Sequence, residues 1–159
     1  MYLGWLLSVF VLVPNILFFK FPPHTTSTKI KHPSRESKLM EAIERIGQVG
    51  VFVIPFFSQT YVKTPAEVLS IPVMMVALMI YYVGWARYFS KGRRQVLLYK
   101  PLMGMPLPLV ISPIIFFLTA SVFLSSELLF VFAFMLGIGH MYVSLAEYHQ
   151  CLADQKRQV

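Results

Sequence analysis

Long apolar runs separated by short polar segments make up most of this chain. A helix that crosses the hydrocarbon core of a bilayer needs about 20 mainly apolar residues, and about 17 are tolerated. Five runs meet this requirement, at residues 2–19, 46–62, 68–86, 108–125 and 128–147. The pattern therefore predicts an all-α membrane protein in which residues 1–159 form a single domain, a bundle of five transmembrane helices.

Two of the polar segments are short enough to be turns. Residues 63–67 place a charge on each side of Pro65, which is typical of a break between two helices. Residues 125–127, Ser-Ser-Glu, offer a serine N-cap and an acidic residue for the first turn of the last helix. The last two helices are therefore expected to form an antiparallel hairpin.

The two longer polar segments, residues 20–45 and 87–107, are expected to be loops on one side of the membrane. Within the first, Leu39, Ile43 and Ile46 recur at helical spacing. This pattern has two interpretations, an interfacial helix that grips anionic lipid or an extension of the second span. The extension is favoured because no break separates the pattern from the span.

The composition supports a location in a membrane. The chain is 57% hydrophobic and 13% charged, whereas a soluble domain is typically about 25% charged. One core of 159 residues cannot hide so much apolar surface, but a bilayer absorbs it. The 8 Tyr, 14 Phe and 2 Trp agree with this, because aromatic rings favour the membrane–water interface.

The positive charges predict the orientation. Of the 14 lysines and arginines, all but Lys63 fall in the two longer loops, at their borders or in the C-terminal tail. Because such residues accumulate on the cytoplasmic side, the N-terminus is expected outside and the C-terminus in the cytoplasm. A multi-pass protein of the plasma or inner membrane is the expected location. The single cysteine, Cys151, excludes an internal disulfide.

The net charge of +7 raises the question of an anionic partner. Since the cations lie between apolar runs, anionic lipids of the cytoplasmic leaflet are the expected partner, and nucleic acid is not. The candidate lipid-headgroup residues are Lys91, Arg93, Arg94 and Lys100. The alternative is that this cluster only sets the orientation.

One face of the last helix is polar. Gly137, His140, Ser144, Glu147 and Cys151 are spaced by three or four residues and therefore share a face. The functional interpretation is a polar track that contacts a proton or a ligand. The alternative, which is favoured, is a helix–helix interface with Gly137 at the close contact and polar groups hydrogen-bonded across it.

A second polar line follows the second span, with Glu44, Gln48, Pro55 and Gln59, and Arg45 lies next to its first residue. Glu44 and Arg45 lie at a depth similar to that of Glu147 and Arg87. Because a charge at membrane depth requires a partner, these four residues are expected to form an ion-paired cluster. Snorkelling of Arg87 to the interface is the alternative.

An aromatic stripe follows the third helix, with Tyr81, Trp85 and Tyr88 on one face beside Gly84. The favoured interpretation is an anchoring belt at the membrane interface. The alternative is the wall of a pocket for a flat or lipidic ligand.

No motif specifies a reaction, so catalytic residues and cofactors stay unknown. No metal site is expected either, because Glu147, His149 and Cys151 alternate along a helix and do not converge. In length and number of helices the chain is similar to the tryptophan-rich translocator proteins, but it lacks their tryptophan- and proline-rich first loop.

The predicted final hairpin is preceded by Tyr99-Lys100-Pro101 and followed by Glu147. In this it resembles the isoprenylcysteine and related phospholipid methyltransferases, which have an Arg-His-Pro-type motif and glutamates at these places. The Arg-His and the paired glutamates are absent here. The resemblance implies a membrane-embedded transferase that acts at the cytoplasmic interface.

Two functions are therefore expected. The favoured one is a bundle that binds, or helps to transport, a hydrophobic or lipidic small molecule, or that serves as a membrane subunit of a larger assembly. The alternative is the methyltransferase-like enzyme.

Overall fold

The computed structural model describes residues 4–23, 35–60, 62–102 and 104–157. In these ranges the chain is helical and forms no β-strand, which confirms the all-α prediction. The elements are α1 Gly4–Lys20, α2 Arg35–Phe57, α3 Pro65–Ser90, the 3-10 helix η1 Gln95–Leu98, α4 Pro108–Phe123 and α5 Glu127–Arg157.

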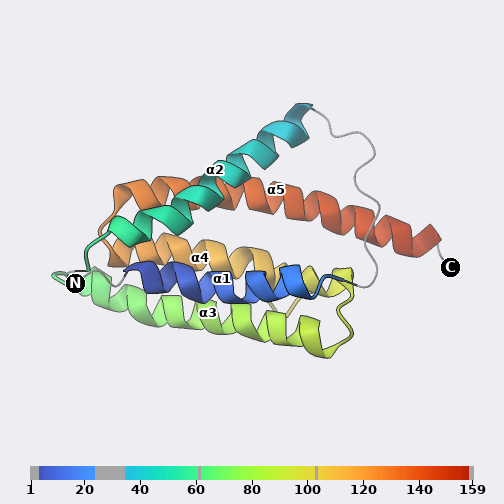
Figure 1. Ribbon diagram of the computed structural model, residues 1–159, viewed down its shortest axis with the longest axis horizontal. Coiled ribbons are helices and arrows are strands. Elements are labelled where there is room, and N and C mark those ends of the chain that lie inside the picture. Colours follow the sequence, from blue (N-terminus) through green and yellow to red (C-terminus); the bar gives the residue numbers. More distant parts are fainter. Residues whose placement is uncertain (1–3, 24–34, 61, 103, 158–159) are drawn as a thin grey trace.

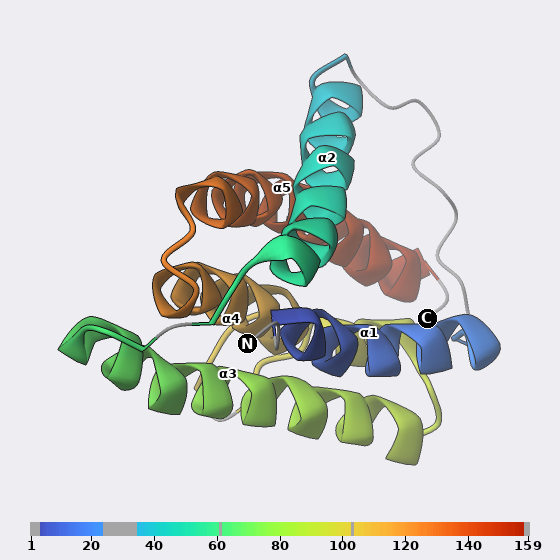
Figure 2. The ribbon, with the colours of Figure 1, turned by 60° about the vertical axis from the view of Figure 1, so that its left-hand side comes forward.

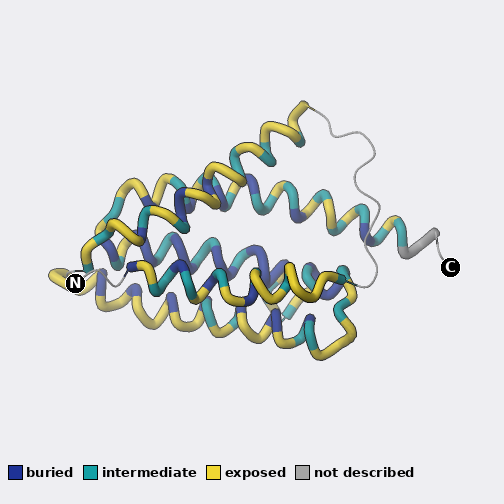
Figure 3. Tube along the Cα trace, in the orientation of Figure 1, coloured by how far each residue is buried: buried dark blue, intermediate teal, exposed yellow. Residues whose placement is uncertain are grey.

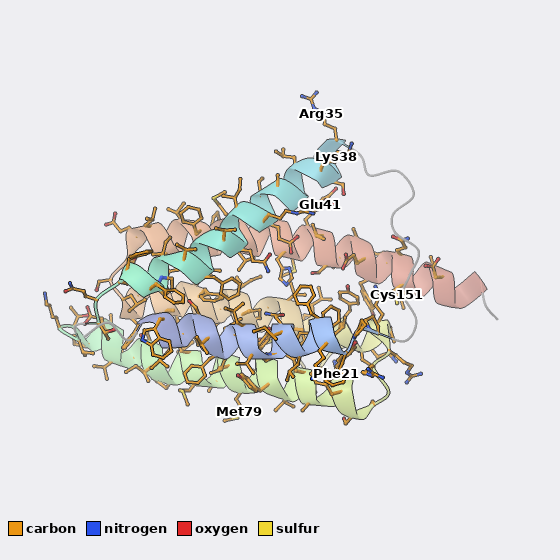
Figure 4. All side chains as sticks on the ribbon, in the orientation of Figure 1. Phe21, Arg35, Lys38, Glu41, Met79 and Cys151 are labelled. Atoms are coloured by element: carbon orange, nitrogen blue, oxygen red, sulfur yellow. The ribbon has the colours of Figure 1, made fainter. Side chains whose placement is uncertain are left out.

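Five α-helices lie side by side around a common interior (Figure 1). Figures 1 and 2 show α1, α3 and α4 together on one side, and α2 and α5 on the other. α2 crosses α5 obliquely, and its first turns rise away from the other helices. Figure 4 places Arg35, Lys38 and Glu41 on this projecting end.

α2 corrects the predicted loop at residues 20–45, because the helix begins at Arg35. It runs without interruption into residues 46–57, so residues 35–45 continue the helix of the predicted second span, as the favoured interpretation expects. The helix ends at Phe57, five residues before the predicted end. Pro55 lies in its last turn, and the Ser58 hydroxyl donates to the Ile54 carbonyl at 3.0 Å.

α3 begins at Pro65. Of the predicted turn at residues 63–67, the first two residues therefore precede the helix and the last three belong to its first turn. Thr64 is the N-cap, and its side chain accepts a hydrogen bond from the Glu67 amide. The Glu67 carboxylate accepts in return from the Thr64 amide at 3.0 Å. This reciprocal capping box, with proline at the first helical position, is a strong helix start.

Glu67 also joins α3 to the opposite hairpin. It is 4% exposed, and its Oε1 accepts from the Ser125 hydroxyl at 2.8 Å. Ser125 lies in the turn between α4 and α5, with a φ of 47°. The Glu67 carboxylate therefore joins the start of α3 to the turn between α4 and α5 at this end of the bundle.

α5 begins as predicted but extends ten residues beyond the predicted end. The Ser126 hydroxyl accepts from the Leu129 amide at 3.2 Å, which confirms a serine N-cap before Glu127. Apolar character stops near Glu147, but residues 148–157 contain no glycine or proline. The helix continues because hydropathy, not helix propensity, changes there.

Proline 14 explains how α1 is attached to α3. A proline has no amide hydrogen, so the carbonyl four residues earlier loses its helical partner. That carbonyl belongs to Phe10, and it accepts from the Tyr82 hydroxyl at 2.8 Å. Two further α3 tyrosines donate to α1 and to the residue after it, Tyr81 to the Val11 carbonyl at 3.4 Å and Tyr88 to the Phe21 carbonyl at 3.3 Å.

α2 and α5 pack through glycine. A Cβ atom on Gly139 would lie 2.5 Å from the Glu44 amide nitrogen, and one on Gly47 would collide with the backbone of Leu136. Gly137, the residue expected at the close contact, instead faces the Ile114 side chain of α4. The polar face of α5 is therefore a helix–helix interface, but Gly137 is not the residue at its close contact with α2.

Two of the described helices are long and apolar enough to cross a membrane, α3 and the part of α5 from Glu127 to Asp154. In their most apolar windows, 33% and 28% of the residues are buried inside the protein. The outer faces remain exposed (Figure 3); Met79 of α3, for example, is 64% exposed (Figure 4). The helices α1 and α4 are apolar but shorter.

The glycine contact leads to a first prediction. Gly139→Ala should lower the free energy of unfolding by about 2 kcal/mol, the usual cost of an added methyl group in a packed interface. Gly137→Ala is the matched control, because its Cβ would meet one side-chain methyl at 3.2 Å and that side chain has room to adjust. Reversible unfolding in detergent compares the two, and an equal loss in both would contradict this account.

Candidate functional site

All five α-helices contribute to one internal cavity of about 240 Å³. Its wall is mainly apolar and aromatic, and its polar edge lies on α2, α5 and the segment after η1. The lining residues are Val11, Asn15, Phe18, Gln48, Phe52, Tyr81, Trp85, Leu98, Tyr99, Leu109, Val110, Pro113, Phe117, Leu136, His140, Ser144 and Glu147.

The first polar contact joins the two helices that glycine brings together. Glu44 Oε1 lies 2.5 Å from His140 Nδ1. The side chains are 18% and 30% exposed respectively. The pair lies next to Gly139, so the close backbone contact is what places these two side chains within hydrogen-bonding distance.

The second polar contact joins the segment before the hairpin to the helix after it. The Tyr99 hydroxyl donates to Glu147 Oε2 at 2.6 Å. Tyr99 follows η1 and is 6% exposed. Burial raises the pKa of its phenol, and the neighbouring Glu147 carboxylate raises it further. The phenol therefore keeps its proton and acts as the donor.

The predicted polar track is present as a geometric feature. His140, Ser144 and Glu147 line the same cavity from successive turns of α5. Ser144 is buried, whereas Glu147 is exposed. Gln48 adds an amide from α2 and is also exposed. The cavity thus extends from the interior to the surface at Gln48 and Glu147.

The predicted four-residue ion-paired cluster is wrong. Glu44 contacts His140, and Glu147 contacts Tyr99. Arg45 is exposed on α2 and does not line the cavity. Imidazole and phenol partners, which are weaker and less conspicuous in sequence than arginine, satisfy the carboxylates.

Arg87 binds backbone. Its guanidinium donates to the carbonyls of Leu97 at 2.9 Å, Lys100 at 2.6 Å and Pro101 at 2.8 Å. These three bonds hold η1 and the residues that follow it, Tyr99 among them, against the end of α3. Arg87 therefore stabilises the segment that forms one wall of the cavity.

The aromatic stripe of α3 faces inward, so its interpretation as an anchoring belt is wrong. Tyr81, Trp85 and Tyr88 are 3%, 7% and 0% exposed. Tyr81 and Trp85 line the cavity, as the pocket-wall alternative expects, whereas Tyr88 does not. Gly84 lets this face approach α4, because a Cβ there would lie 2.7 Å from the Leu109 side chain.

The basic cluster after α3 is at the surface. Lys91, Arg94 and Lys100 are exposed. Arg93 is half-buried and lies over the Phe21 ring, with its guanidinium carbon 5.7 Å from the ring centroid. Binding of lipid headgroups by these residues stays a prediction.

Two participants are not identified as site residues by their sequence pattern. Tyr99 is the partner of Glu147, and its only signal is its place directly before a lysine and a proline. Gly139 is missed because its neighbour Gly137 fits the spacing of the polar face. Comparisons with protein-family models, with curated proteins and with solved structures find no match.

The contact between Glu44 and His140 leads to a second prediction. In a double-mutant cycle, Glu44→Ala and His140→Ala should couple by about 1 kcal/mol, because hydrogen bonds between membrane helices average about 0.6 kcal/mol and reach about 1.7 kcal/mol. Arg45→Ala, the next residue on α2, should not couple to His140→Ala. Unfolding in detergent measures both cycles. Additivity in the first, or equal coupling in the second, would argue against the pair.

Proposed function

We propose that the chain is a five-span membrane protein that holds one hydrophobic or lipidic small molecule in its internal cavity. The observation that supports this most is the composition of the cavity. An apolar and aromatic wall with a few polar groups at one edge is the usual form of a small-molecule site.

Exposed apolar side chains support the membrane location. Large hydrophobic residues are exposed on all five α-helices, among them Ile16, Val49, Leu69, Val122 and Phe134. A soluble protein rarely exposes such continuous apolar surface. A core helix of a soluble protein would also be mostly buried, unlike α3 and α5.

The ends of the bundle support the orientation. The C-terminal ends of α1, α3 and α5 and the N-terminal ends of α2 and α4 all lie toward the same, right-hand side of Figure 1. The cations Lys20, Arg35, Arg87 and Lys91 are at this end, whereas Lys63 is at the other. In the proposed orientation the basic end faces the cytoplasm. α1, at 17 residues, and α4, at 16 residues, then require slight thinning of the bilayer.

A topology measurement tests the five crossings. A reporter fused after Val159 should be active only in the cytoplasm, and one inserted after Lys63 only on the outer side. Because four spans would move the C-terminus to the outer side, a fusion after Val159 that reports there contradicts the proposal.

The wall and edge of the cavity also indicate how a ligand lies. An alkyl chain fits against Phe52, Phe117 and Trp85, and a polar group fits at the edge formed by His140 and Glu147. Since Glu147 is exposed at the basic end, the polar group of the ligand faces the cytoplasmic leaflet.

Tryptophan fluorescence tests this binding. In a Trp5→Phe variant, Trp85 is the only tryptophan and lines the cavity. A brominated single-chain alcohol should quench it saturably. Ser144→Phe, which fills the cavity, should weaken quenching about tenfold, since a blocked pocket loses more than one kcal/mol of contact.

Leu145→Phe is the matched control for this experiment. Leu145 is the next residue on α5 and is 39% exposed outside the cavity. Its quenching curve should match that of the parent. Equal quenching in the Ser144→Phe variant, or a linear response without saturation, would show that the probe dissolves in the surrounding lipid and does not enter a site.

A second candidate is a membrane-embedded transferase. The contact between Tyr99 and Glu147 favours it, because it joins the residues that resemble the methyltransferase hairpin. Addition of S-adenosylmethionine to the purified chain distinguishes the two functions. A rise in the unfolding temperature would support the enzyme and count against a simple binding protein.

A further inference from the structure

The charge of the cavity is opposite to that of the chain. The protein has a net charge of +7, yet no lysine or arginine is among the cavity-lining residues that the structure describes. The ionisable groups at its polar edge are Glu147, His140 and Tyr99, with Glu44 directly behind His140. An anionic head group would therefore meet carboxylates and no lysine or arginine.

The carboxylates have capacity for a further donor. Tyr99 engages one oxygen of Glu147, and His140 engages one oxygen of Glu44. A carboxylate offers about four acceptor positions on its two oxygens. Glu147 is exposed where the cavity reaches the surface, so it is the first charged group of the lining that an incoming head group meets.

An independent feature of the wall also indicates a ligand. Trp85 is 7% exposed, and its indole Nε1 is a buried donor without a hydrogen-bond partner among the described residues. The adjacent Tyr81 hydroxyl gives its hydrogen to the Val11 carbonyl, and its oxygen interacts with Trp85 without forming a hydrogen bond of normal geometry. Such an orphaned donor is unfavourable, and an oxygen atom of a bound molecule would satisfy it.

We infer that the cavity takes a single-chain amphiphile that carries a protonated amino group and an additional hydroxyl or carbonyl oxygen. The ammonium group binds Glu147 and lies in the field of Glu44. The oxygen accepts from Trp85 Nε1. The alkyl chain occupies the apolar wall. This inference rests on the proposed function and specifies its ligand class.

The alternatives fit less well. A fatty acid places a carboxylate beside Glu147, and like charges at such a site repel. A fatty alcohol fills the wall but lacks the charge-assisted hydrogen bond, which is roughly twice as strong as a neutral one. A ring cation over Trp85 would gain from the aromatic face but would leave its N–H without an acceptor.

Three ten-carbon probes that differ only in the head group test the inference. Radiolabelled decylamine, decanol and decanoate are bound to the full chain in nanodiscs of neutral phosphatidylcholine, and empty nanodiscs give the background partition. Decylamine should bind about tenfold more tightly than decanol, in line with a bond to a charged group. Decanoate should bind most weakly.

Removal of the Glu147 charge tests whether this residue binds the ammonium group. Glu147→Gln should weaken decylamine binding about fivefold and decanol binding much less, because a neutral hydroxyl can still bond to the glutamine amide. Glu36→Gln is the matched control, because it removes the same charge from an exposed position in the first turn of α2, outside the cavity. It should change neither affinity. Glu44→Gln, which keeps an acceptor for His140, is the second variant if Glu147→Gln does not fold.

The indole is tested by an amino alcohol of the same chain length. It should bind about threefold more tightly than decylamine, because its hydroxyl oxygen accepts from Trp85. Trp85→Phe keeps an aromatic ring but removes the donor. It should abolish this advantage, so that the amino alcohol loses more affinity than decylamine, which loses only contact with the smaller ring.

The outcomes separate the inference from the proposed function. If decanol binds saturably but decylamine binds no better, or if Glu36→Gln acts as strongly as Glu147→Gln, the ligand class is wrong and the binding function stands. If decanoate binds best, the ligand class is likewise overturned. If none of the three probes saturates, the proposed binding function fails and the inference fails with it.

Discussion

The close approach of α2 and α5 is the contact on which the rest of the structure depends. In the proposed membrane location no hydrophobic driving force acts between helices, so short backbone separations and interhelical hydrogen bonds supply the attraction. Glycines 47 and 139 allow the separation, and the contact between Glu44 and His140 uses it. The same crossing sets how far the first turns of α2 stand from the bundle.

Charged groups near the cavity are satisfied locally rather than by one another. Glu147 accepts a hydrogen bond from a phenol, Glu44 contacts an imidazole, and Arg87 donates to three backbone carbonyls. In each case the group finds a partner within a few residues of a helix crossing or a turn. This arrangement leaves the lining without a basic side chain, although the surface around it is basic.

The sequence predicts the five apolar helices and the polar face of α5 because these depend on periodicity and local composition. It predicts helix ends less well. α2 and α5 continue past the limits of their apolar runs, because polar residues such as Glu41 and Gln150 are also good helix formers. The break near Pro65 is predicted and lies between α2 and α3, but the capping box that starts α3 depends on side-chain hydrogen bonds that the sequence does not show.

Partner choice could not be predicted from the sequence, because it depends on how helices distant in the chain cross. Glu44 and His140 are 96 residues apart in the sequence. The two acids and two arginines expected at similar depth can pair in several ways. The inward orientation of Tyr81 and Trp85 depends likewise on the tight contact of Gly84 with α4. Which face of α3 is covered by the other helices therefore depends on how the helices pack together.

The carboxylate of Glu67 has a consequence for exchange. It ties the start of α3 to the turn between α4 and α5, at the end of the bundle opposite to the exposed Glu147 at the edge of the cavity. In the proposed binding function, a ligand that enters beside Glu147 leaves by the same route. In the proposed orientation, such a protein would store or present its guest to the cytoplasmic side rather than move it across the bilayer.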